Sequence, residues 1–215
     1  MTKLYSRWRD DWRRPPFRRS LAATIPLLIL TLVALTRFLT WVEARPGVRF
    51  VDPVLALYTP IDCTWAAFLL IYAGLLVGIG FLAWNPDELL LALQTYVIMV
   101  VFRIVAMFLL PLEPPAFLIP LQDPFVQQLG TGTLLTKDLF FSGHTSTMFL
   151  LFLTARGARL KAVFLICTVG VAISVLLQHV HYSVDVFVAP FFAYAAYRVA
   201  LAIDRRYVGT GAKSA

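Results

Sequence analysis

The chain has 215 residues, of which 60% are hydrophobic and only 14% carry a charge. With a mean hydropathy of +0.77, this composition is not that of a soluble globular protein and indicates a polytopic membrane protein. The net charge of +7 does not indicate nucleic-acid binding, because seven of the nineteen Lys and Arg residues lie in the first twenty positions. A basic cluster placed there indicates membrane topology and contact with lipid headgroups.

Long apolar runs divide the chain. A helix needs roughly 20 apolar residues to cross the hydrocarbon core of a bilayer. We therefore expect an all-α integral membrane protein with a basic cytoplasmic arm at 1–20, a six-helix catalytic domain at 21–203 and a cytoplasmic tail at 204–215. The first run is too long for a cleavable signal peptide. The six predicted crossings are 21–40, 64–84, 89–110, 139–155, 160–178 and 182–203.

Two long segments interrupt these runs, at 41–63 and 111–138. The second contains five prolines among apolar residues, and we expect it to lie in the membrane interface or to fold over the protein. The two cysteines, Cys63 and Cys167, fall at different predicted depths. The sequence therefore predicts neither a disulfide nor a metal site.

The positions of Lys and Arg predict the orientation. With the N-terminus inside, thirteen of these residues lie on the cytoplasmic side, in the arm, in the 155–161 turn and in the tail. Only Arg45, Arg49 and Lys137 lie on the other side. This asymmetry predicts that both termini are cytoplasmic. The fourth and sixth crossings then both start on the non-cytoplasmic face.

Two polar clusters occur at those starts, at 141–145 and at 179–185, and together they contain all three histidines. His181 and Asp185 are four residues apart, so they share one face of a helix. A carboxylate in that position orients and stabilises an imidazole. The other cluster supplies His144. Because both clusters are predicted on one face of the membrane, we expect His144, His181 and Asp185 to form one catalytic site.

The same helix starts favour an anion. Unpaired backbone N–H groups and the helix dipole attract negative charge there. Ser142 offers an N-cap hydroxyl, and Gly143 lets a ligand approach the backbone closely. Arg103 in the third crossing is costly to bury unless it serves a polar site, pairs or reaches the interface. We expect a phosphate to bind among these residues, with Lys137 and Asp138 at the rim.

The clusters resemble the second and third signature motifs of the type 2 phosphatidic acid phosphatase superfamily, and they are closest to its sphingomyelin synthase-like branch. That branch reads Asp-x-x-Phe-Ser-Gly-His-Thr and His-Tyr-Thr-x-Asp-Val, and this chain has corresponding residues at 138–145 and 181–186. The stretch 103–111 is also similar to an Arg-x-x-x-Met-x-x-x-Leu-Pro stretch of the branch. The resemblance implies a six-helix layout and adds Tyr182 as a candidate for substrate binding.

The chain departs from the phosphatase pattern at two places. The first phosphatase motif, Lys-x6-Arg-Pro, has its nearest spacing at Arg7 and Arg14-Pro15, on the side predicted to face away from the site. The third motif normally opens with Ser-Arg, whereas here Ser174 is followed by Val175. These absences favour the synthase-like branch. They leave Arg103, Lys137 and the helix dipoles to neutralise a phosphate.

The chemistry of these groups and the resemblance together predict a double displacement through a phosphohistidine. His181 attacks the phosphorus, and His144 protonates the leaving oxygen and then deprotonates the acceptor. The partners are a membrane phospholipid donor and a lipid alcohol, ceramide or diacylglycerol, with no metal or other cofactor. Two alternatives stay open: a lipid phosphate phosphatase acting on a phosphatidate or isoprenyl phosphate, and a non-enzymatic lipid-binding or lipid-translocating protein.

Several of these residues also have structural readings. His179 is expected to be structural or to lie at the rim, because it projects away from His181. Ser142 is expected first to cap its helix and only second to bind phosphate. Lys137 is more simply interpreted as a solvated charge at the rim. A short chain of this kind suits a bacterial inner membrane, with the site on the non-cytoplasmic face. The sequence carries no sign of its oligomeric state.

Overall fold

The computed structural model describes residues 2–121 and 135–211 as helices joined by extended segments, without a strand in those ranges. The all-α prediction is therefore confirmed for the described chain. The elements are α1 (Thr2–Trp12), α2 (Pro15–Ala44), the short 3-10 helix η1 (Leu55–Leu57), α3 (Thr64–Ala83), α4 (Pro86–Leu109), α6 (Gly143–Thr154), α7 (Ala158–Leu177) and α8 (Ser183–Gly211).

Five of these helices are long and apolar enough to cross a membrane: α2, α3, α4, α7 and α8 as far as Ile203. Much of their apolar surface faces outward, since only 11% of the most apolar window of α2 and 44% of that of α4 is buried. An apolar face that is not covered by protein fits lipid contact. These helices are those of a multi-pass integral membrane protein.

The fourth predicted crossing is different. Helix α6 has 12 residues, which gives it a length of about 18 Å against a hydrocarbon core of about 30 Å. The sequence prediction placed its start at Leu139, but residues 139–142 are not helical and Ser142 caps the helix. Six crossings of full length are thus not confirmed: among the described residues, five helices are long enough to cross and α6 is shorter.

Tryptophans mark both ends of α3. Trp65 in its first turn is 87% exposed, and Trp84 directly after its last residue is 48% exposed. Nineteen residues of helix separate them, a rise of about 28 Å. Because tryptophan prefers the membrane–water interface, this spacing fits a helix that crosses the hydrocarbon core from one interface to the other.

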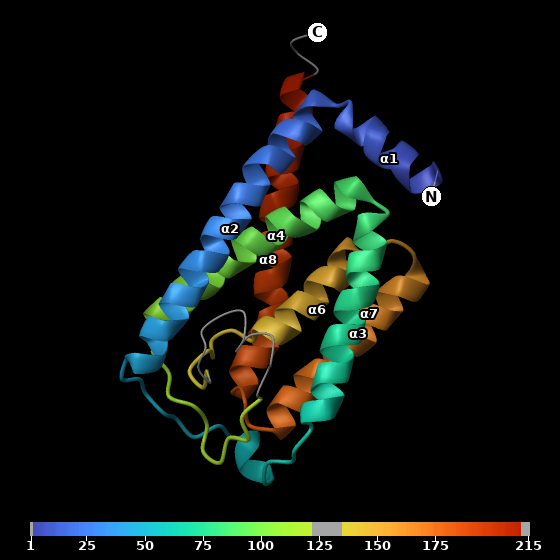
Figure 1. Ribbon diagram of the computed structural model, residues 1–215. Helices are drawn as coiled ribbons and strands as arrows, with labels where there is room; N and C mark the ends of the chain where they lie inside the picture. The colour runs from blue at the N-terminus through green and yellow to red at the C-terminus, as the bar shows by residue number, and fades with distance from the viewer. Residues whose placement is uncertain (1, 122–134, 212–215) are drawn as a thin grey trace.

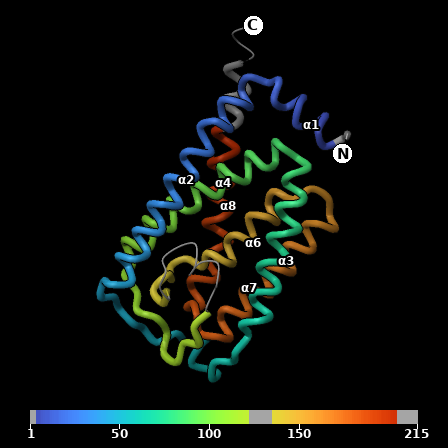
Figure 2. The backbone as a smooth tube through the Cα atoms, in the orientation of Figure 1, coloured from blue at the N-terminus to red at the C-terminus, as the bar shows by residue number. Residues whose placement is uncertain are grey.

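Successive helices run in alternate directions, so that both termini lie at the same end of the molecule (Figures 1 and 2). We call this the terminal end; it also carries α1, whose Trp8 indole donates to the Ala83 carbonyl at 2.8 Å. The opposite end, the loop end, consists of residues 45–63, 111–121 and 135–142. The starts of α6 and α8 both point toward it (Figure 1).

Small side chains bring the central helices close together. Ala189, Ala193, Ala196 and Ala200 on α8 are fully buried, at helical spacings of four and three, and α8 packs against α4 and α6. Small residues at such spacings let helix backbones approach closely. Helix α6 also packs on α7, so the short helix is held on two sides and its N-terminus is fixed.

The segments of the loop end are tied to one another. The Val48 amide donates to the Pro111 carbonyl at 2.8 Å, and the Glu113 amide donates to Val48 at 3.0 Å. The Ile119 amide donates to Gln178 at the end of α7, at 2.9 Å. The described part of the proline-rich segment, 111–121, therefore folds over the helix ends; residues 122–134 lie outside the described residues.

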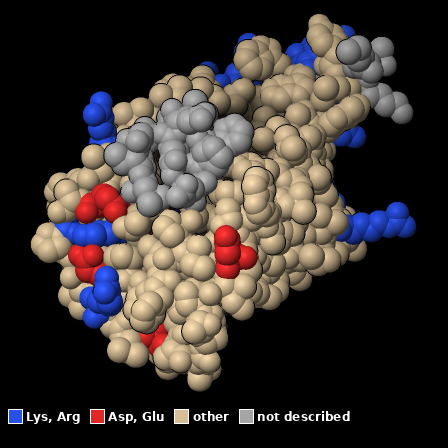
Figure 3. Space-filling model, turned by 60° about the horizontal axis from the view of Figure 1, so that its bottom comes forward, with Lys and Arg blue, Asp and Glu red and all other residues tan. Residues whose placement is uncertain are grey.

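Figure 3 views the loop end. Most of the visible surface there is uncharged, and acidic and basic side chains gather at one edge. Three basic residues of the loop end have fixed partners: Arg45 donates to the carbonyl of Met107 at 2.7 Å, Arg49 donates to that of Pro114 at 2.9 Å, and Lys137 pairs with Glu113 at 2.8 Å. The basic residues of this end therefore anchor its loops.

Candidate active site

The two polar clusters are in direct contact. The Ser142 amide, which precedes α6, donates to the Asp185 carbonyl in the first turn of α8 at 3.1 Å. Ser142 also caps α6, because its hydroxyl accepts from the Thr145 amide at 3.5 Å. Two helix N-termini thus meet at one place, each with a surplus of backbone N–H groups.

His181 and Asp185 form a buried pair. His181 Nδ1 lies 3.4 Å from Asp185 Oδ2, and their side chains are 3% and 0% exposed. The same carboxylate oxygen accepts from the Tyr182 amide at 3.0 Å, which fixes its position. With Nδ1 turned toward a carboxylate, the tautomer that carries its proton there is favoured, and Nε2 keeps a free lone pair.

Arg103 on α4 reaches the same place. Its guanidinium pairs with the Asp138 carboxylate, and the Arg103 side chain is 10% exposed. Its Nη1 packs so closely on Gly143 that a Cβ at that position would collide with it. Only a glycine lets the guanidinium rest on the start of α6. Arg103 therefore forms an ion pair with Asp138 and also contacts the start of α6 in the polar site.

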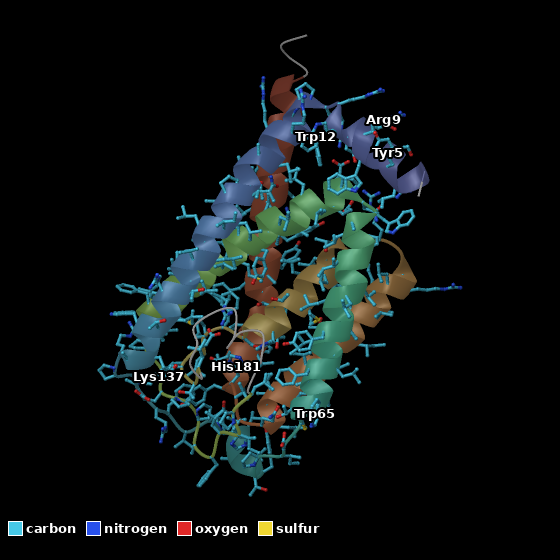
Figure 4. The ribbon with its side chains drawn as sticks, viewed as in Figure 1. Tyr5, Arg9, Trp12, Trp65, Lys137 and His181 are labelled. Atoms are coloured by element: carbon cyan, nitrogen blue, oxygen red, sulfur yellow. The ribbon has the colours of Figure 1, made fainter. Side chains whose placement is uncertain are left out.

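These groups line one cavity of about 530 Å³. Its polar part is formed by Arg103, Asp138, Gly143, His144, Thr147 and His181. The rest of its wall is mainly apolar and comes from α2, α3, α4 and α6, with Leu118, Pro120, Leu121 and Leu135 from the loop end. In Figure 4, His181 lies among the helices at the lower centre. The cavity thus joins a polar head to an apolar body.

The apolar body extends along α3, from Ile71 to Leu82. Eleven residues of helix correspond to about 16 Å, so the cavity runs from the polar site well toward the terminal end. Leu35 and Leu39 of α2 form the facing wall. A long apolar space of this kind suits the hydrocarbon chain of a lipid, whereas a compact sugar or nucleotide would leave it unfilled.

Four predicted site residues do not line the cavity: Lys137, Ser142, Tyr182 and Asp185. Lys137 pairs with Glu113, and its ammonium also donates to the Arg45 carbonyl at 2.9 Å. The hydrogen bond from Lys137 lowers the pKa of the Glu113 carboxyl below its usual value. In Figure 4, Lys137 lies on the side of α2, apart from His181. The ion pair with Glu113 therefore gives Lys137 a structural role at the rim of the site.

Tyr182, another of these residues, is fully buried. Its hydroxyl donates to the Glu113 carbonyl at 2.9 Å, and its ring stacks on that of Phe50 with centroids 4.0 Å apart. The tyrosine therefore packs the start of α8 against the loops. Ser142 and Asp185 also lie behind the cavity wall, where they hold Thr145 and His181.

His179 has a structural place, as its spacing from His181 predicted. It adopts a left-handed backbone conformation with φ of 56°. Its Nδ1 lies 3.1 Å from the Ala116 carbonyl, and its ring meets Tyr58 edge to face. The histidine connects the α7–α8 turn to the segment that folds over it.

Asp52 supports the site but was not identified from the sequence. Its side chain is buried, and it accepts from the Ser183 amide at 2.6 Å and from the Ser183 hydroxyl at 3.0 Å. It also accepts from the amides of Val54 and Leu55. Burial opposes its ionisation, but these hydrogen bonds outweigh burial and lower the pKa of the Asp52 carboxyl. Asp52 therefore caps α8 from a distant loop.

Among the residues that the structure describes, no three or more His, Cys, Asp or Glu side chains are grouped so that they could hold an ion. The polar part of the cavity instead contains one guanidinium, one carboxylate and two imidazoles.

The chain was compared with known proteins. Residues 137–201, less than a third of the chain, match the family model described as PAP2 superfamily C-terminal. This match covers both polar clusters and supports the resemblance to type 2 phosphatidic acid phosphatases, without distinguishing a branch. No curated protein and no solved structure matches the chain.

Proposed function

We propose that this protein is a membrane lipid phosphotransferase that moves a phospholipid head group to a lipid alcohol through a phosphohistidine. One observation carries the proposal: two histidines, one of them backed by a buried carboxylate, meet an arginine at the polar head of a single cavity with an apolar body. Similarity to the PAP2 superfamily supports phosphatase or phosphotransferase chemistry.

In the first step, Nε2 of His181 attacks the phosphorus of the donor. A P–N bond forms while the P–O bond to the leaving alcohol breaks, and the leaving oxygen takes a proton from His144. Asp185 stabilises the positive charge that develops on the His181 ring. The contact of 3.4 Å between His181 Nδ1 and Asp185 Oδ2 supports this role.

In the second step, the hydroxyl of the acceptor attacks the phosphohistidine. Its proton passes to His144, a P–O bond forms and the P–N bond breaks, which returns both histidines to their starting states. With water as the acceptor, the same two steps give hydrolysis. The apolar body of the cavity favours a lipid acceptor, because its walls solvate a hydrocarbon chain and offer water few partners.

Charge builds up on the phosphoryl oxygens during both steps. Arg103 and the N–H groups at the start of α6 are positioned to stabilise it. Donors that are fixed in place before the reaction stabilise such charge without reorganising. Gly143 serves this arrangement because it lets the guanidinium lie against the helix start.

We further propose that α6 acts as a short sixth crossing, so that both termini are cytoplasmic. The basic residues near the terminal end support this orientation. The catalytic site would then open on the non-cytoplasmic side, which in a bacterial inner membrane is the periplasmic side. Protease accessibility of tags at either terminus in sealed vesicles tests the orientation.

The first experiment is a product analysis of the purified protein in mixed lipid bilayers. Labelled phospholipid and phosphomonoester donors are supplied together with ceramide and diacylglycerol, and His181→Ala is assayed beside the wild type. We expect a new lipid that bears the transferred head group and is absent with the variant. Acid-labile phosphate on the wild-type protein would report the intermediate.

Other outcomes would change the assignment. Free phosphate from a monoester, without dependence on a lipid alcohol, would make the protein a phosphatase. Full activity of His181→Ala would exclude the phosphohistidine. A complete lack of turnover over a broad panel of donors would favour a non-enzymatic lipid-binding protein.

A further inference from the structure

The permanent charges at the polar head of the cavity balance each other. Among the described residues that line it, Arg103 is the only Lys or Arg and Asp138 the only Asp or Glu, and the two pair with each other. A phosphate that binds at the polar head therefore meets a guanidinium whose charge is already balanced by the Asp138 carboxylate.

Other cations of the loop end are occupied elsewhere. Arg45 donates to the carbonyls at the end of α4, Arg49 donates to Pro114, and Lys137 pairs with Glu113. In the sequence, residues 122–134 contain no Lys or Arg. Among the described residues that line the site, the permanent charges are therefore those of Arg103 and Asp138, and the only further positive charge is the proton that His144 carries as the general acid.

Phosphate esters differ in charge. A phosphodiester carries one negative charge, whereas a phosphomonoester carries about −1.5 to −2 at pH 7, because its second pKa is about 6. Each added negative charge is repelled by a nearby carboxylate, and the repulsion is strong where burial lowers the local dielectric. A buried arginine that is paired with an aspartate thus suits the diester better than the monoester.

We propose that Asp138 selects the charge of the substrate. By matching Arg103, it makes the cavity accept a phosphodiester and discriminate against a phosphomonoester. This inference rests on the proposed function and deepens it, because it names the donor class.

Binding of two matched probes tests the proposal without turnover. Dioctanoyl phosphatidate and dioctanoyl phosphatidylmethanol have the same chains and differ by one methyl group on the phosphate, so that only the first gains a second charge. The full-length protein is used in maltoside micelles at pH 8, in a His181→Ala background that prevents chemistry. The readout is the ratio of the two dissociation constants, from calorimetry.

In the His181→Ala protein we expect phosphatidylmethanol to bind about tenfold more tightly than phosphatidate, the size of effect that one opposed charge gives in a partly buried site. Adding Asp138→Asn should bring the two dissociation constants together, mainly by tightening phosphatidate. Asp138→Glu, which keeps the charge, should retain the preference. Asp62→Asn is the matched control, because it removes an exposed carboxylate and leaves an amide oxygen that can accept the same hydrogen bond from the Thr64 amide.

Two results would overturn the proposal. If Asp138→Asn weakens both probes equally, Asp138 only holds Arg103 in place. If the ratio does not change, the carboxylate does not set the selectivity. Neither result bears on the transferase assignment, which the product analysis decides separately.

A second measurement needs no change at Asp138 and covers the case in which Asp138→Asn does not fold. At pH 5 phosphatidate is close to a monoanion, so its disadvantage in the His181→Ala protein should shrink toward unity. Among the residues that the structure describes, the other titratable or charged side chains that line the cavity are Tyr72, Tyr96, Arg103 and His144, with Asp185 behind the replaced His181. At pH 5 both probes carry about one negative charge, so the protonation state of these side chains acts on both alike. A ratio that stays the same between pH 8 and pH 5 would contradict the proposal.

Discussion

The loop end and the terminal end of this protein hold their charges in different ways. At the loop end, Arg103, Asp52 and Asp185 are buried, and each has fixed partners. At the terminal end, the side chains of the Arg14–Asp87 pair are 49% and 55% exposed, and Figure 4 shows Tyr5, Arg9 and Trp12 on the outer side of α1. Both ends are polar, but only one is preorganised.

This difference separates two uses of charge in a membrane protein. A buried charge costs desolvation energy and is kept only where partners in a fixed geometry stabilise it. Catalysis also requires charged groups that are fixed in place before the reaction. An exposed charge costs little and contributes little to stability, but it orients the chain in the membrane. Variants at the two ends should therefore differ in size and in kind of effect.

The largest effect is expected for Asp185→Asn. The amide keeps an acceptor for the Tyr182 amide, but it no longer favours the His181 tautomer with its proton on Nδ1. We expect kcat to fall by about 10²–10⁴-fold while the unfolding transition in SDS is nearly unchanged. Activity above a tenth of wild type would show that the carboxylate does not orient the nucleophile.

Gly143→Ala should have the next largest effect. The added Cβ collides with the Arg103 guanidinium, which must then move away from the start of α6. We expect turnover to fall by about 10–100-fold, as for a catalytic group displaced by about 1 Å. Gly80→Ala is the matched control, since nothing lies within 4 Å of a Cβ at Gly80; equal losses in the two variants would argue against the Arg103 contact.

Asp52→Ala tests the distant cap of α8. The loss of its hydrogen bonds to Ser183, Val54 and Leu55 should lower the free energy of unfolding by about 1–3 kcal/mol. Because the pKa of this carboxyl is lowered on folding, its stabilisation is complete above its usual value of 3.8 and disappears as pH falls through the lower folded value. The difference between wild type and variant should therefore be constant near neutral pH and vanish in acid.

Asp62→Ala provides the comparison for that measurement. The Asp62 carboxylate accepts from the Thr64 amide, the first of α3, at 2.9 Å, but Asp62 is exposed. We expect its replacement to lower the free energy of unfolding by less than that of Asp52, because water competes for an exposed hydrogen bond. A larger cost for Asp62 would mean that burial of the cap does not matter.

The smallest effect is expected at the terminal end, for Arg14→Gln. Its exposed pairs with Asp11 and Asp87 should contribute no more than about 0.5 kcal/mol to the free energy of unfolding, and activity should not change. A thermal or SDS unfolding curve measures the stability. A loss above about 1 kcal/mol would remove the contrast between the two ends.

Most helices were predictable because apolar length is a local property. The predicted crossing 64–84 corresponds to α3, and 160–178 corresponds to α7, each within two residues. The start of α6 was placed too early, because Leu139 and Phe141 are apolar but are buried in the segment before the helix. Hydropathy does not distinguish an apolar residue in a helix from one in a buried extended segment.

The site was predictable in part. The spacing of His181 and Asp185 and the Ser142-Gly143-His144 cluster are local patterns, and both led to the cavity or its supporting wall. Lys137 and Tyr182 carry the right chemistry in the right motifs, but their side chains turn to Glu113. Asp52 gave no signal beyond a polar residue before a proline, because its partner Ser183 is 131 positions away.

The sequence by itself determined the all-helical class, the approximate crossings and the pairing of His181 with Asp185, because each follows from periodicity or spacing within one segment. Only the tertiary structure decided that Asp138 matches Arg103, that Gly143 leaves room for the guanidinium and that Asp52 caps α8. Those contacts join segments far apart in the chain, and they depend on how the helices pack, which no local pattern specifies.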